Sequence, residues 1–310
     1  MATMLAKAFS ADRNRAMESV RLFRPQEHQM PFFLSNAPNR CIIGGNRSGK
    51  TASAAAYFAA IATGLQMTGH DGKLLPYPFP RDRPLILWVI GYGEKHISSP
   101  IYPMLFKAGA FKIIKDKTTG EWRAFHPVFD KDRITECRDA PPLIPPRFIE
   151  SIVWTNKGAK QFEIVTLKNG NEIRAFTSTG EAKQGDKVDL IWIDEDISVP
   201  LHVCEWQQRL KDRMGKLIWS AMPHCNNWAL VEMCDKAIEQ MREREHPNFH
   251  MTRLSQTANI YISDEAKALS LEELGEDEIR KRVDGEFVND SFLMYPAFSK
   301  LIHCWPSPPG

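Results

Sequence analysis

The segment from residue 44 to residue 51 constrains the fold of this chain more than any other feature of its sequence. It fits the pattern Gly-x-x-x-x-Gly-Lys-[Ser/Thr] without a mismatch. The segment reads Gly44-Gly45-Asn46-Arg47-Ser48-Gly49-Lys50-Thr51. An apolar run at 41–43 precedes it, and small, helix-compatible residues follow at 52–56. This order predicts a buried strand, a glycine-rich turn and a helix, which is the context that a phosphate-binding P-loop requires.

The residue types in this loop predict a nucleotide ligand, ATP, together with Mg²⁺. Glycines let the backbone wrap around phosphate oxygens with its N–H groups pointing inward. Lys50 is expected to reach the β- and γ-phosphates, and the Thr51 hydroxyl is expected to hold Mg²⁺. Arg47 has two interpretations of equal weight. Its guanidinium either contacts the γ-phosphate or pairs with an acidic residue and positions the loop.

A second segment supplies the acidic partner that a P-loop needs. The apolar run that ends at residue 193 is followed directly by Asp194 and Glu195. This pattern is typical of a Walker B strand followed by a catalytic glutamate. Asp194 is predicted to hold Mg²⁺, and Glu195 is predicted to orient and polarise the attacking water. An acidic residue directly after the metal ligand favours hydrolysis over passive nucleotide binding.

Two further motifs carry weaker predictions. A glutamine amide offers both a donor and an acceptor to the edge of adenine, and Gln29 is the preferred adenine reader, with Gln26 as second choice. A solvated glutamine is the alternative. The other motif follows a predicted strand at 217–219 and reads Ser220-Ala221-Met222-Pro223. Ser220 is predicted to sense the γ-phosphate and relay its loss, although the tetrapeptide could also be a simple strand-to-turn transition.

The rest of the chain alternates between strand and helix patterns. Further strands are predicted at 85–90 and 190–193, and Asn169-Gly170 predicts a hairpin that joins 162–167 to 172–176. Helices are predicted at 12–24, 228–243 and 269–283, the last with a capping box from Ser270 to Glu273. Residues 111–147 are expected to form a surface excursion. The alternation predicts an α/β fold with a mostly parallel sheet and helices on both faces.

Composition excludes few function classes. The chain of 310 residues has 43% hydrophobic and 25% charged residues, which is typical of a globular protein, and no apolar stretch approaches the roughly 20 residues that span a bilayer. The spacing of His224, Cys225 and Cys234 fits no common zinc pattern, so buried reduced thiols are preferred over a zinc site. With a net charge of +2, any DNA-binding surface must be local. The candidates are two basic clusters. One comprises Arg209, Lys211, Arg213 and Lys216, and the other Lys157 and Lys160. The alternative for each cluster is a solvated face with no DNA contact.

Taken in this order, the motifs resemble the ATPase domain of tailed-phage terminase large subunits. The arginine-containing P-loop, Gln184-Gly185-Asp186 before the Walker B strand, and the Ser220–Pro223 motif all look like that family. The segments 282–287 and 295–298 look like the family's join between ATPase and nuclease domains. The resemblance covers roughly residues 22–300.

The resemblance implies a RecA-like P-loop ATPase core with a small helical lid subdomain. We expect residues 1–248 to form the core with its N-terminal helix, 249–290 the lid, and 291–310 a linker toward a nuclease domain. Only twelve residues follow Phe298, and none is acidic. Nuclease activity is therefore not expected from this chain.

The resemblance also implies a function. ATP would be hydrolysed to ADP and phosphate to move double-stranded DNA into a capsid, in the cytoplasm of the infected bacterial host. The implied partners are double-stranded DNA, the portal protein and the terminase small subunit, with no membrane. The working motor would be a homo-oligomeric ring, whereas the isolated chain could be a monomer. Arg138 or Arg147 could reach a neighbouring site in the ring. The alternatives are a helicase-like nucleic-acid-dependent ATPase, which would need a second RecA-like domain, and a nucleotide-dependent assembly module with little turnover.

Overall fold

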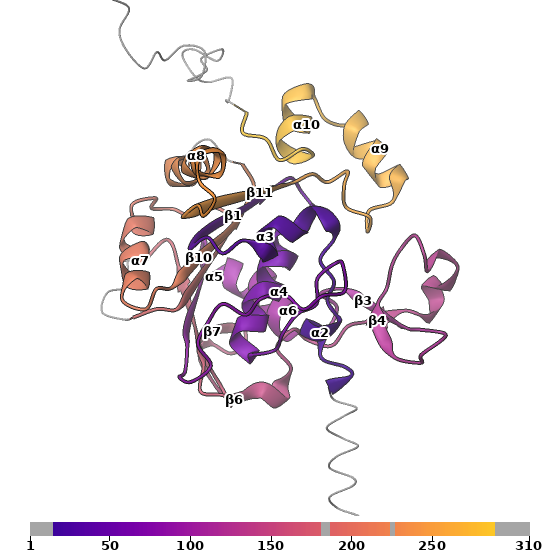
Figure 1. Ribbon diagram of the computed structural model, residues 1–310, viewed down its shortest axis with the longest axis horizontal. Helices are drawn as coiled ribbons and strands as arrows, with labels where there is room; N and C mark the ends of the chain where they lie inside the picture. The colour runs from indigo at the N-terminus through magenta and orange to yellow at the C-terminus, as the bar shows by residue number, and fades with distance from the viewer. Residues whose placement is uncertain (1–14, 181–186, 224–226, 289–310) are drawn as a thin grey trace, which may run out of the picture.

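The structure is a computed structural model that describes residues 15–180, 187–223 and 227–288, and an eight-stranded sheet forms its centre (Figure 1). The strand order is β11-β1-β10-β9-β2-β8-β7-β6. The strands are β1 (Asn39–Gly44), β2 (Ile86–Gly91), β6 (Ile149–Asn156), β7 (Gln161–Leu167), β8 (Glu172–Thr177), β9 (Leu190–Asp194), β10 (Lys216–Ala221) and β11 (Phe249–Leu254). The first six strands in this order pair in parallel, while β8, β7 and β6 pair antiparallel. The predicted α/β fold, its mostly parallel sheet and its hairpin are confirmed.

The sheet topology gathers the predicted motifs at one edge. Parallel strands have their carboxyl ends on the same side, and β10 lies between β1 and β9. Ser220 of β10 pairs with Ile42 of β1 on one side and with Asp194 of β9 on the other. The P-loop, the Walker B carboxylates and the Ser220 segment therefore meet at this edge, although up to about 170 residues of sequence separate them.

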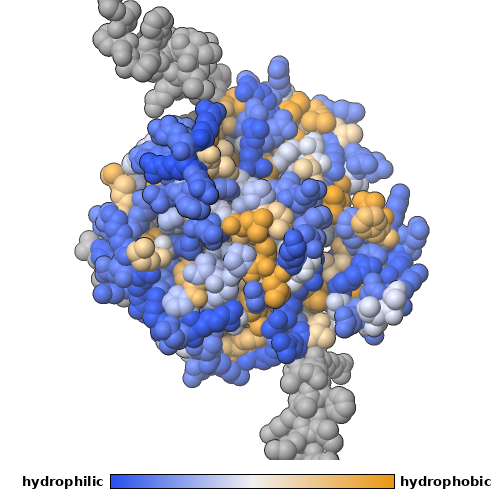
Figure 2. Space-filling model, viewed as in Figure 1, coloured by the Kyte–Doolittle hydropathy of each residue, from blue (hydrophilic) through white to orange (hydrophobic). Residues whose placement is uncertain are grey.

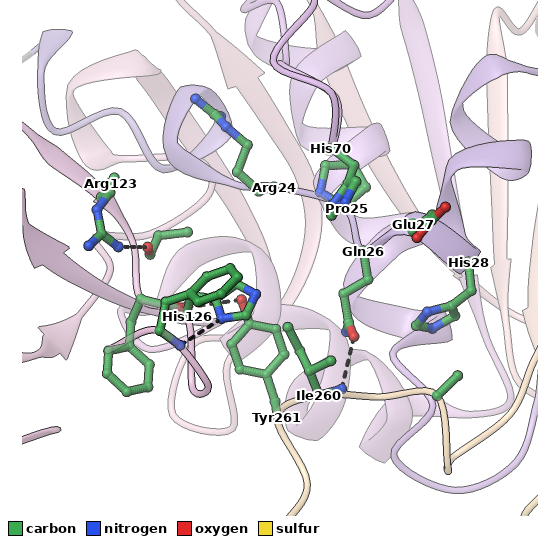
Figure 3. Close-up of a pocket in the computed structure, with 14 residues that line it drawn as sticks. Arg24, Pro25, Gln26, Glu27, His28, His70, Arg123, His126, Ile260 and Tyr261 are labelled. Carbon is green, nitrogen blue, oxygen red and sulfur yellow. Dashed lines mark hydrogen bonds between the residues drawn. The ribbon is translucent and has the colours of Figure 1, made fainter. Parts of the chain in front are cut away.

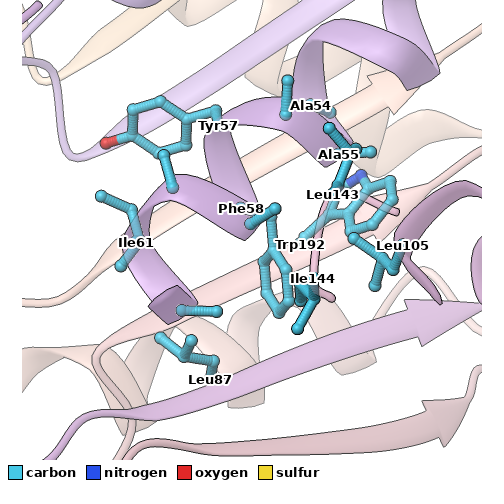
Figure 4. Close-up of a cluster of buried hydrophobic side chains, with 14 of the residues drawn as sticks. Ala54, Ala55, Tyr57, Phe58, Ile61, Leu87, Leu105, Leu143, Ile144 and Trp192 are labelled. Carbon is cyan, nitrogen blue, oxygen red and sulfur yellow. The ribbon is translucent and has the colours of Figure 1, made fainter. Parts of the chain in front are cut away.

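Helices cover both faces of the sheet, as predicted, and successive residues of a strand point to opposite faces. On one face, α4 (Lys50–Thr63) packs on Trp192 of β9, whose ring centroid lies 5.5 Å from that of Phe58 (Figure 4). On the other face, Ile191 and Ile193 pack in a second apolar cluster with α7 (His202–Lys211) and α8 (Trp228–Glu243). Among the described residues, no helix combines the length and the apolar character needed to cross a membrane.

Short helical segments complete the face that carries α4. They are α2 (Ser19–Leu22), η1 (Glu27–Gln29), α3 (Met30–Leu34), α5 (Glu94–His96), η2 (Ile97–Ile101), α6 (Tyr102–Phe106) and η4 (Pro146–Phe148). The helix predicted over 12–24 is shorter than expected. Residues 12–14 lie outside the described residues, and α2 ends before Pro25, which disfavours helical backbone at the preceding residue.

The predicted excursion at 111–147 has a small sheet of its own. Its antiparallel strands are β3 (Lys112–Lys115), β4 (Trp122–Ala124) and β5 (Arg138–Asp139), in the order β4-β3-β5, with the helical turn η3 (Lys131–Glu136) between β4 and β5. Ile113 and Ala140 bury their side chains with Leu22 of α2, so the inner side of this small sheet is anchored to the N-terminal segment.

The last described helices differ from the prediction. Instead of one helical stretch over 269–283, there are two helices, α9 (Asp264–Glu272) and α10 (Glu276–Arg282). The predicted capping box at Ser270 is wrong, because Ser263 is the N-cap of α9 and accepts a hydrogen bond from the Ala266 amide at 3.2 Å. Ser270 lies inside that helix, where its hydroxyl donates to the Ala266 carbonyl at 2.9 Å. Gly275 separates the two helices.

The strand β11 bears on how the chain is divided. It pairs in parallel with β1 along its whole length, so residues 249–254 belong to the main sheet, although they were assigned to the lid. The helices α9 and α10 follow this strand and lie beyond it (Figure 1). The division into core, lid and linker stays a prediction, and residues 291–310 lie outside the described part of the chain.

Candidate nucleotide-binding site

The P-loop connects β1 to α4 with the geometry expected of a phosphate cradle. Gly49 adopts a left-handed conformation with a φ of 92°, and α4 begins at the next residue, Lys50. The Lys50 side chain is buried and points across the edge of the sheet to Glu195, with 3.0 Å between Nζ and Oε1. The loop thus presents a helix N-terminus and an ammonium group on the same side, which together attract phosphate.

Asp194 and Thr51, the two predicted metal ligands, are in contact. The Thr51 hydroxyl donates to Asp194 Oδ1 at 3.0 Å, and the carboxylate is 1% exposed. Hydroxyl and carboxylate oxygens fit Mg²⁺, which usually binds one or two carboxylates together with substrate phosphates. Among the residues described, no three His, Cys, Asp or Glu side chains gather into a metal site.

Glu195 is held in an unusual backbone conformation. Its φ is 62°, a region that non-glycine residues rarely occupy outside functional sites. Its amide donates to the Ser220 carbonyl at 2.6 Å, and its carbonyl accepts from Trp219 Nε1 at 2.8 Å. The two oxygens of the Glu195 side chain have different partners. Oε1 pairs with Lys50, and Oε2 accepts a hydrogen bond from the Met222 amide at 3.1 Å.

The Ser220–Pro223 segment contacts both carboxylates. Ser220 is fully buried, and its hydroxyl donates to Asp194 Oδ1 at 2.6 Å while accepting from Trp192 Nε1 at 2.9 Å. Ala221 ends β10, and the Met222 amide holds Glu195, before the chain turns at Pro223. The predicted coupling motif therefore lies against the Walker B residues, while its role as a phosphate sensor remains a prediction.

Arg47 is exposed at the tip of the loop. Its φ is 56°, and its carbonyl accepts a hydrogen bond from Asn259 Nδ2 at 2.6 Å. Within the described ranges its guanidinium forms no ion pair, and the two nearby carboxylates are engaged by other groups. The interpretation in which Arg47 pairs with an acid is therefore not what this structure shows, and contact with the γ-phosphate stays a prediction.

Both predicted adenine readers lie beside the P-loop. Gln26 already uses both ends of its amide, because Nε2 donates to Asn259 Oδ1 at 2.9 Å and Oε1 accepts from the Ile260 amide at 3.0 Å. Gln29 accepts from the Gln26 amide through Oε1 at 2.9 Å, and its Nε2 lies so close to Gly49 that a Cβ there would come within 2.6 Å. Of the two glutamines, Gln29 is closer to the phosphate cradle.

A cavity of about 940 Å³ opens next to Gly49 and Ala52 and is walled largely by apolar side chains such as Phe111, Phe125 and Ile260. A second cavity of about 940 Å³ shares Arg24, Gln26, Phe125 and Ile260 with it and continues past His28, His70 and His126 (Figure 3). Burial lowers the pKa of His28 and of His126, which favours their neutral forms.

Figure 2 shows that the face viewed in Figure 1 is mostly hydrophilic, with apolar side chains gathered near its centre.

Three groups at this site were not predicted from the sequence. His96 Nε2 lies 3.0 Å from Asp194 Oδ2. Asn259 bridges Gln26 and the Arg47 carbonyl. The Arg282 carbonyl accepts from the Asn46 amide at 2.8 Å, and Gly285, with a φ of 67°, lies against Gly44. The only available signal was the glycine within 282–287, a segment assigned instead to the join between domains.

Part of the basic cluster at 209–216 has partners within the chain. Arg213 binds the buried carboxylate of Asp189 at 2.7 Å, as does Arg83 from the other side. Lys216 donates to the Asn36 carbonyl at 3.0 Å, and burial lowers its pKa to about 8. Lys157 and Lys160 are exposed between β6 and β7.

The two arginines predicted to reach a neighbouring site also have partners within the chain. Arg138 lies over the Trp122 ring at 3.6 Å, and Arg147 pairs with Glu18 at 3.0 Å. Both would have to leave these partners to reach another subunit. Residues 184–186, His224, Cys225 and 295–298 lie outside the described residues.

Comparisons with known proteins give a consistent result at the level of structure. No family model and no curated protein matches the sequence. The ATPase domain of the large terminase of Thermus phage P74-26 matches with a TM-score of 0.51 and 15% identity, over 87% of this chain and 96% of that one. The large terminase of a thermophilic bacteriophage, solved in complex with ADP, matches with a TM-score of 0.51 and 14% identity, over 89% of this chain and 57% of that one.

The large terminase of bacteriophage HK97 matches with a TM-score of 0.51 and 11% identity, over 87% of this chain and 53% of that one. The chain thus spans little more than half the length of the HK97 protein and of the terminase solved with ADP. The chain has the RecA-like fold of phage large-terminase ATPase domains.

Proposed function

We propose that this chain is the ATPase motor domain of a phage terminase, which hydrolyses ATP to ADP and phosphate and uses the energy to move double-stranded DNA into a capsid. The observation that carries the proposal is the meeting of two segments at the edge of the sheet. Lys50 and Thr51 of the P-loop contact Glu195 and Asp194 of the Walker B strand, each pair at 3.0 Å. The proposed phosphate cradle, metal site and water-orienting base therefore lie next to one another at this edge of the sheet.

Each residue has a role in phosphoryl transfer. The backbone amides of the loop, from Gly45 to Thr51, cradle the phosphates, and Lys50 binds the β- and γ-phosphates. Thr51 and Asp194 hold Mg²⁺, which neutralises charge on the phosphate oxygens when it is bound. Arg47, exposed at the tip of the loop, is placed to contact the γ-phosphate.

Glu195 orients the attacking water. The Met222 amide fixes its Oε2, so the direction of the carboxylate is set before ATP binds. When Lys50 turns to the γ-phosphate, Oε1 becomes available to accept a hydrogen bond from water. One third of the glutamate side chain is exposed, which leaves room for that water.

The nucleobase binds in the apolar cavity beside Gly49 and Ala52. Gln29 is the preferred reader of the adenine edge, because Gln26 already uses both ends of its amide on residues 259 and 260. The likeness to terminases supports the other partners. These are double-stranded DNA, the portal protein, the terminase small subunit and further copies of this chain in a ring, within the cytoplasm of the infected bacterial host.

The test is ATP hydrolysis by the purified chain over a range of protein concentrations, with Lys50→Ala and Glu195→Gln as controls. Turnover that vanishes in both variants supports the ATPase, and turnover per chain that rises with concentration supports completion of the site by a neighbour. Lys50-dependent ATP binding with no turnover at any concentration would favour the assembly module with little turnover.

Nucleic acid separates the motor from the helicase-like alternative. A packaging motor is expected to be stimulated more by double-stranded than by single-stranded DNA, with a steep dependence on salt because phosphate contacts release counterions. Stimulation by single strands alone would favour the helicase-like ATPase.

A further inference from the structure

We propose that His96 is a positioning residue that fixes the metal-binding carboxylate of Asp194 and thereby raises the affinity of the site for the Mg²⁺–nucleotide complex. The inference rests on the proposed function, because it assumes that Asp194 serves a nucleotide-bound metal. Its basis is one contact. Nε2 of His96 lies 3.0 Å from Oδ2 of Asp194, and 18% of the histidine side chain and 1% of the aspartate side chain are exposed.

With this contact, each of the two oxygens of Asp194 has its own hydrogen-bond partners. Oδ1 accepts from the hydroxyls of Thr51 and Ser220, at 3.0 and 2.6 Å. Among the described residues, Oδ2 has one hydrogen-bond partner, Nε2 of His96. The three donors belong to three different elements, α4, β10 and α5, so together they restrain rotation of the carboxylate. Without His96, Oδ2 loses its restraint, and the carboxylate is held through Oδ1 alone, by Thr51 and Ser220.

The end of β2 makes room for the imidazole. This strand ends at Gly91, where a Cβ would come within 3.1 Å of His96 Cδ2 and 3.0 Å of Ile97 Cδ1. Ile90, just before Gly91, pairs with Ile193, just before Asp194, so the glycine and the aspartate end neighbouring strands. A side chain at position 91 would occupy the space through which His96 reaches the carboxylate.

The backbone after His96 has a rare conformation. Residues Ile97–Ile101 form a π-helix directly after the three residues of α5. Such π-turns occur mostly as single turns and are frequent at functional sites. Gly91 and this turn together give His96 a fixed approach to Asp194.

The chemistry of the contact favours a positioning role over direct contact with the nucleotide. An imidazole N–H that donates to a carboxylate forms a charge-assisted hydrogen bond. Partners of this kind, one step removed from the metal, orient the ligand, and their loss typically weakens metal affinity by about 10- to 100-fold. The expected effect of losing His96 therefore appears in the Mg²⁺ requirement and leaves the binding of metal-free nucleotide unchanged.

The experiment measures binding of a fluorescent ADP analogue at increasing Mg²⁺ and in EDTA. The variants are His96→Leu, which removes the donor, His96→Gln, whose Nε2 can donate from a similar distance, and Lys95→Gln, an exposed neighbour on α5, as the matched control. We expect His96→Leu to need about tenfold more Mg²⁺ for half-maximal binding. Its affinity in EDTA should equal that of the wild type, His96→Gln should recover most of the difference, and Lys95→Gln should behave as the wild type.

Two results would overturn the inference. One is the same Mg²⁺ requirement in His96→Leu and in the wild type. The other is an equal loss of affinity with and without Mg²⁺, which would mean that His96 supports the fold of the site in general. If the wild type binds no nucleotide in either condition, the proposed function is wrong, and the inference fails with it. Thermal unfolding checks that each variant is folded, and His96→Asn, with a shorter amide, replaces the leucine variant if that one is not.

Discussion

Lys50 of the P-loop and Glu195 of the Walker B strand form an ion pair, with 3.0 Å between Nζ and Oε1. The lysine side chain is 8% exposed and the glutamate side chain 33%, so the pair lies at the mouth of the site. The γ-phosphate of ATP and Glu195 would compete for the same ammonium group. Under the proposed function, the pair would therefore link nucleotide binding to the freedom of Glu195, the residue proposed to orient water.

Glu195→Gln should abolish hydrolysis and retain ATP binding. An amide keeps the size of the side chain but is a poor base, so turnover is expected to fall by at least about 100-fold, the scale of general base catalysis. Because the variant no longer holds Lys50 by charge, the affinity for ATP should stay the same or rise. Steady-state hydrolysis and equilibrium binding measure the two effects separately. Glu163→Gln, an exposed glutamate on β7, is the control, and hydrolysis at the wild-type rate in Glu195→Gln would remove Glu195 from the mechanism.

Ser220→Ala should destabilise the fold as well as the site. Its hydroxyl is fully buried and joins Trp192 Nε1 to Asp194 Oδ1. Removing it leaves a buried donor without its partner, which typically costs about 1–3 kcal/mol. Urea unfolding of the two proteins measures the difference, and Ser151→Ala, at an exposed position on β6, should change stability little. Equal stability of wild type and Ser220→Ala would mean that water replaces the hydroxyl.

Local patterns were enough to predict the centre of the site. The P-loop, Asp194 and Glu195 each stand at the end of an apolar strand, and parallel strands bring such ends together. His96 and Asn259 could not be predicted in this way, because their roles depend on contacts with residues 98 and 212 positions away. Neither the periodicity nor the residue spacing in the sequence around His96 and Asn259 indicates those contacts.

The wrong prediction of the capping box at Ser270 also has a local cause. Two serines compete to cap the helices after residue 260, and the structure uses Ser263, while Ser270 bonds to the preceding turn. In the basic cluster at 209–216, Arg213 bonds to Asp189 and Lys216 to the Asn36 carbonyl, which a count of charges along the sequence does not reveal. DNA binding by this cluster stays a prediction.

Lys216 should make the protein more stable as the pH rises from about 8 toward the pKa of an unfolded lysine. Burial lowers the pKa of Lys216 in the folded protein from 10.5 to about 8, so in this range the unfolded chain binds more protons than the folded chain. The free energy of unfolding therefore increases with pH across this window, and below it the full cost of burying the charge remains. Lys216→Met should be less dependent on pH over the same window. The difference in unfolding free energy between wild type and variant, measured at pH 7, 8, 9 and 10, isolates this group from tyrosines and cysteines. If this difference in unfolding free energy stayed constant from pH 7 to pH 10, the pH dependence could not be assigned to Lys216.

Gly285→Ala should loosen the contact between residues 282–286 and the P-loop. Gly285 has a φ of 67°, and a Cβ there would lie 2.8 Å from the Gly44 Cα, so alanine meets both backbone strain and a collision with the loop. We expect a loss of stability above about 1 kcal/mol, larger than that of an alanine that meets the backbone strain alone, and weaker ATP binding. Gly72→Ala is the matched control, because that glycine has a φ of 79° but no atom within 4 Å of the added Cβ. It carries the backbone strain without the collision, so unfolding and ATP-binding measurements on the two variants separate these effects. If both variants lose the same stability and neither loses ATP affinity, contact with residue 285 does not shape the P-loop.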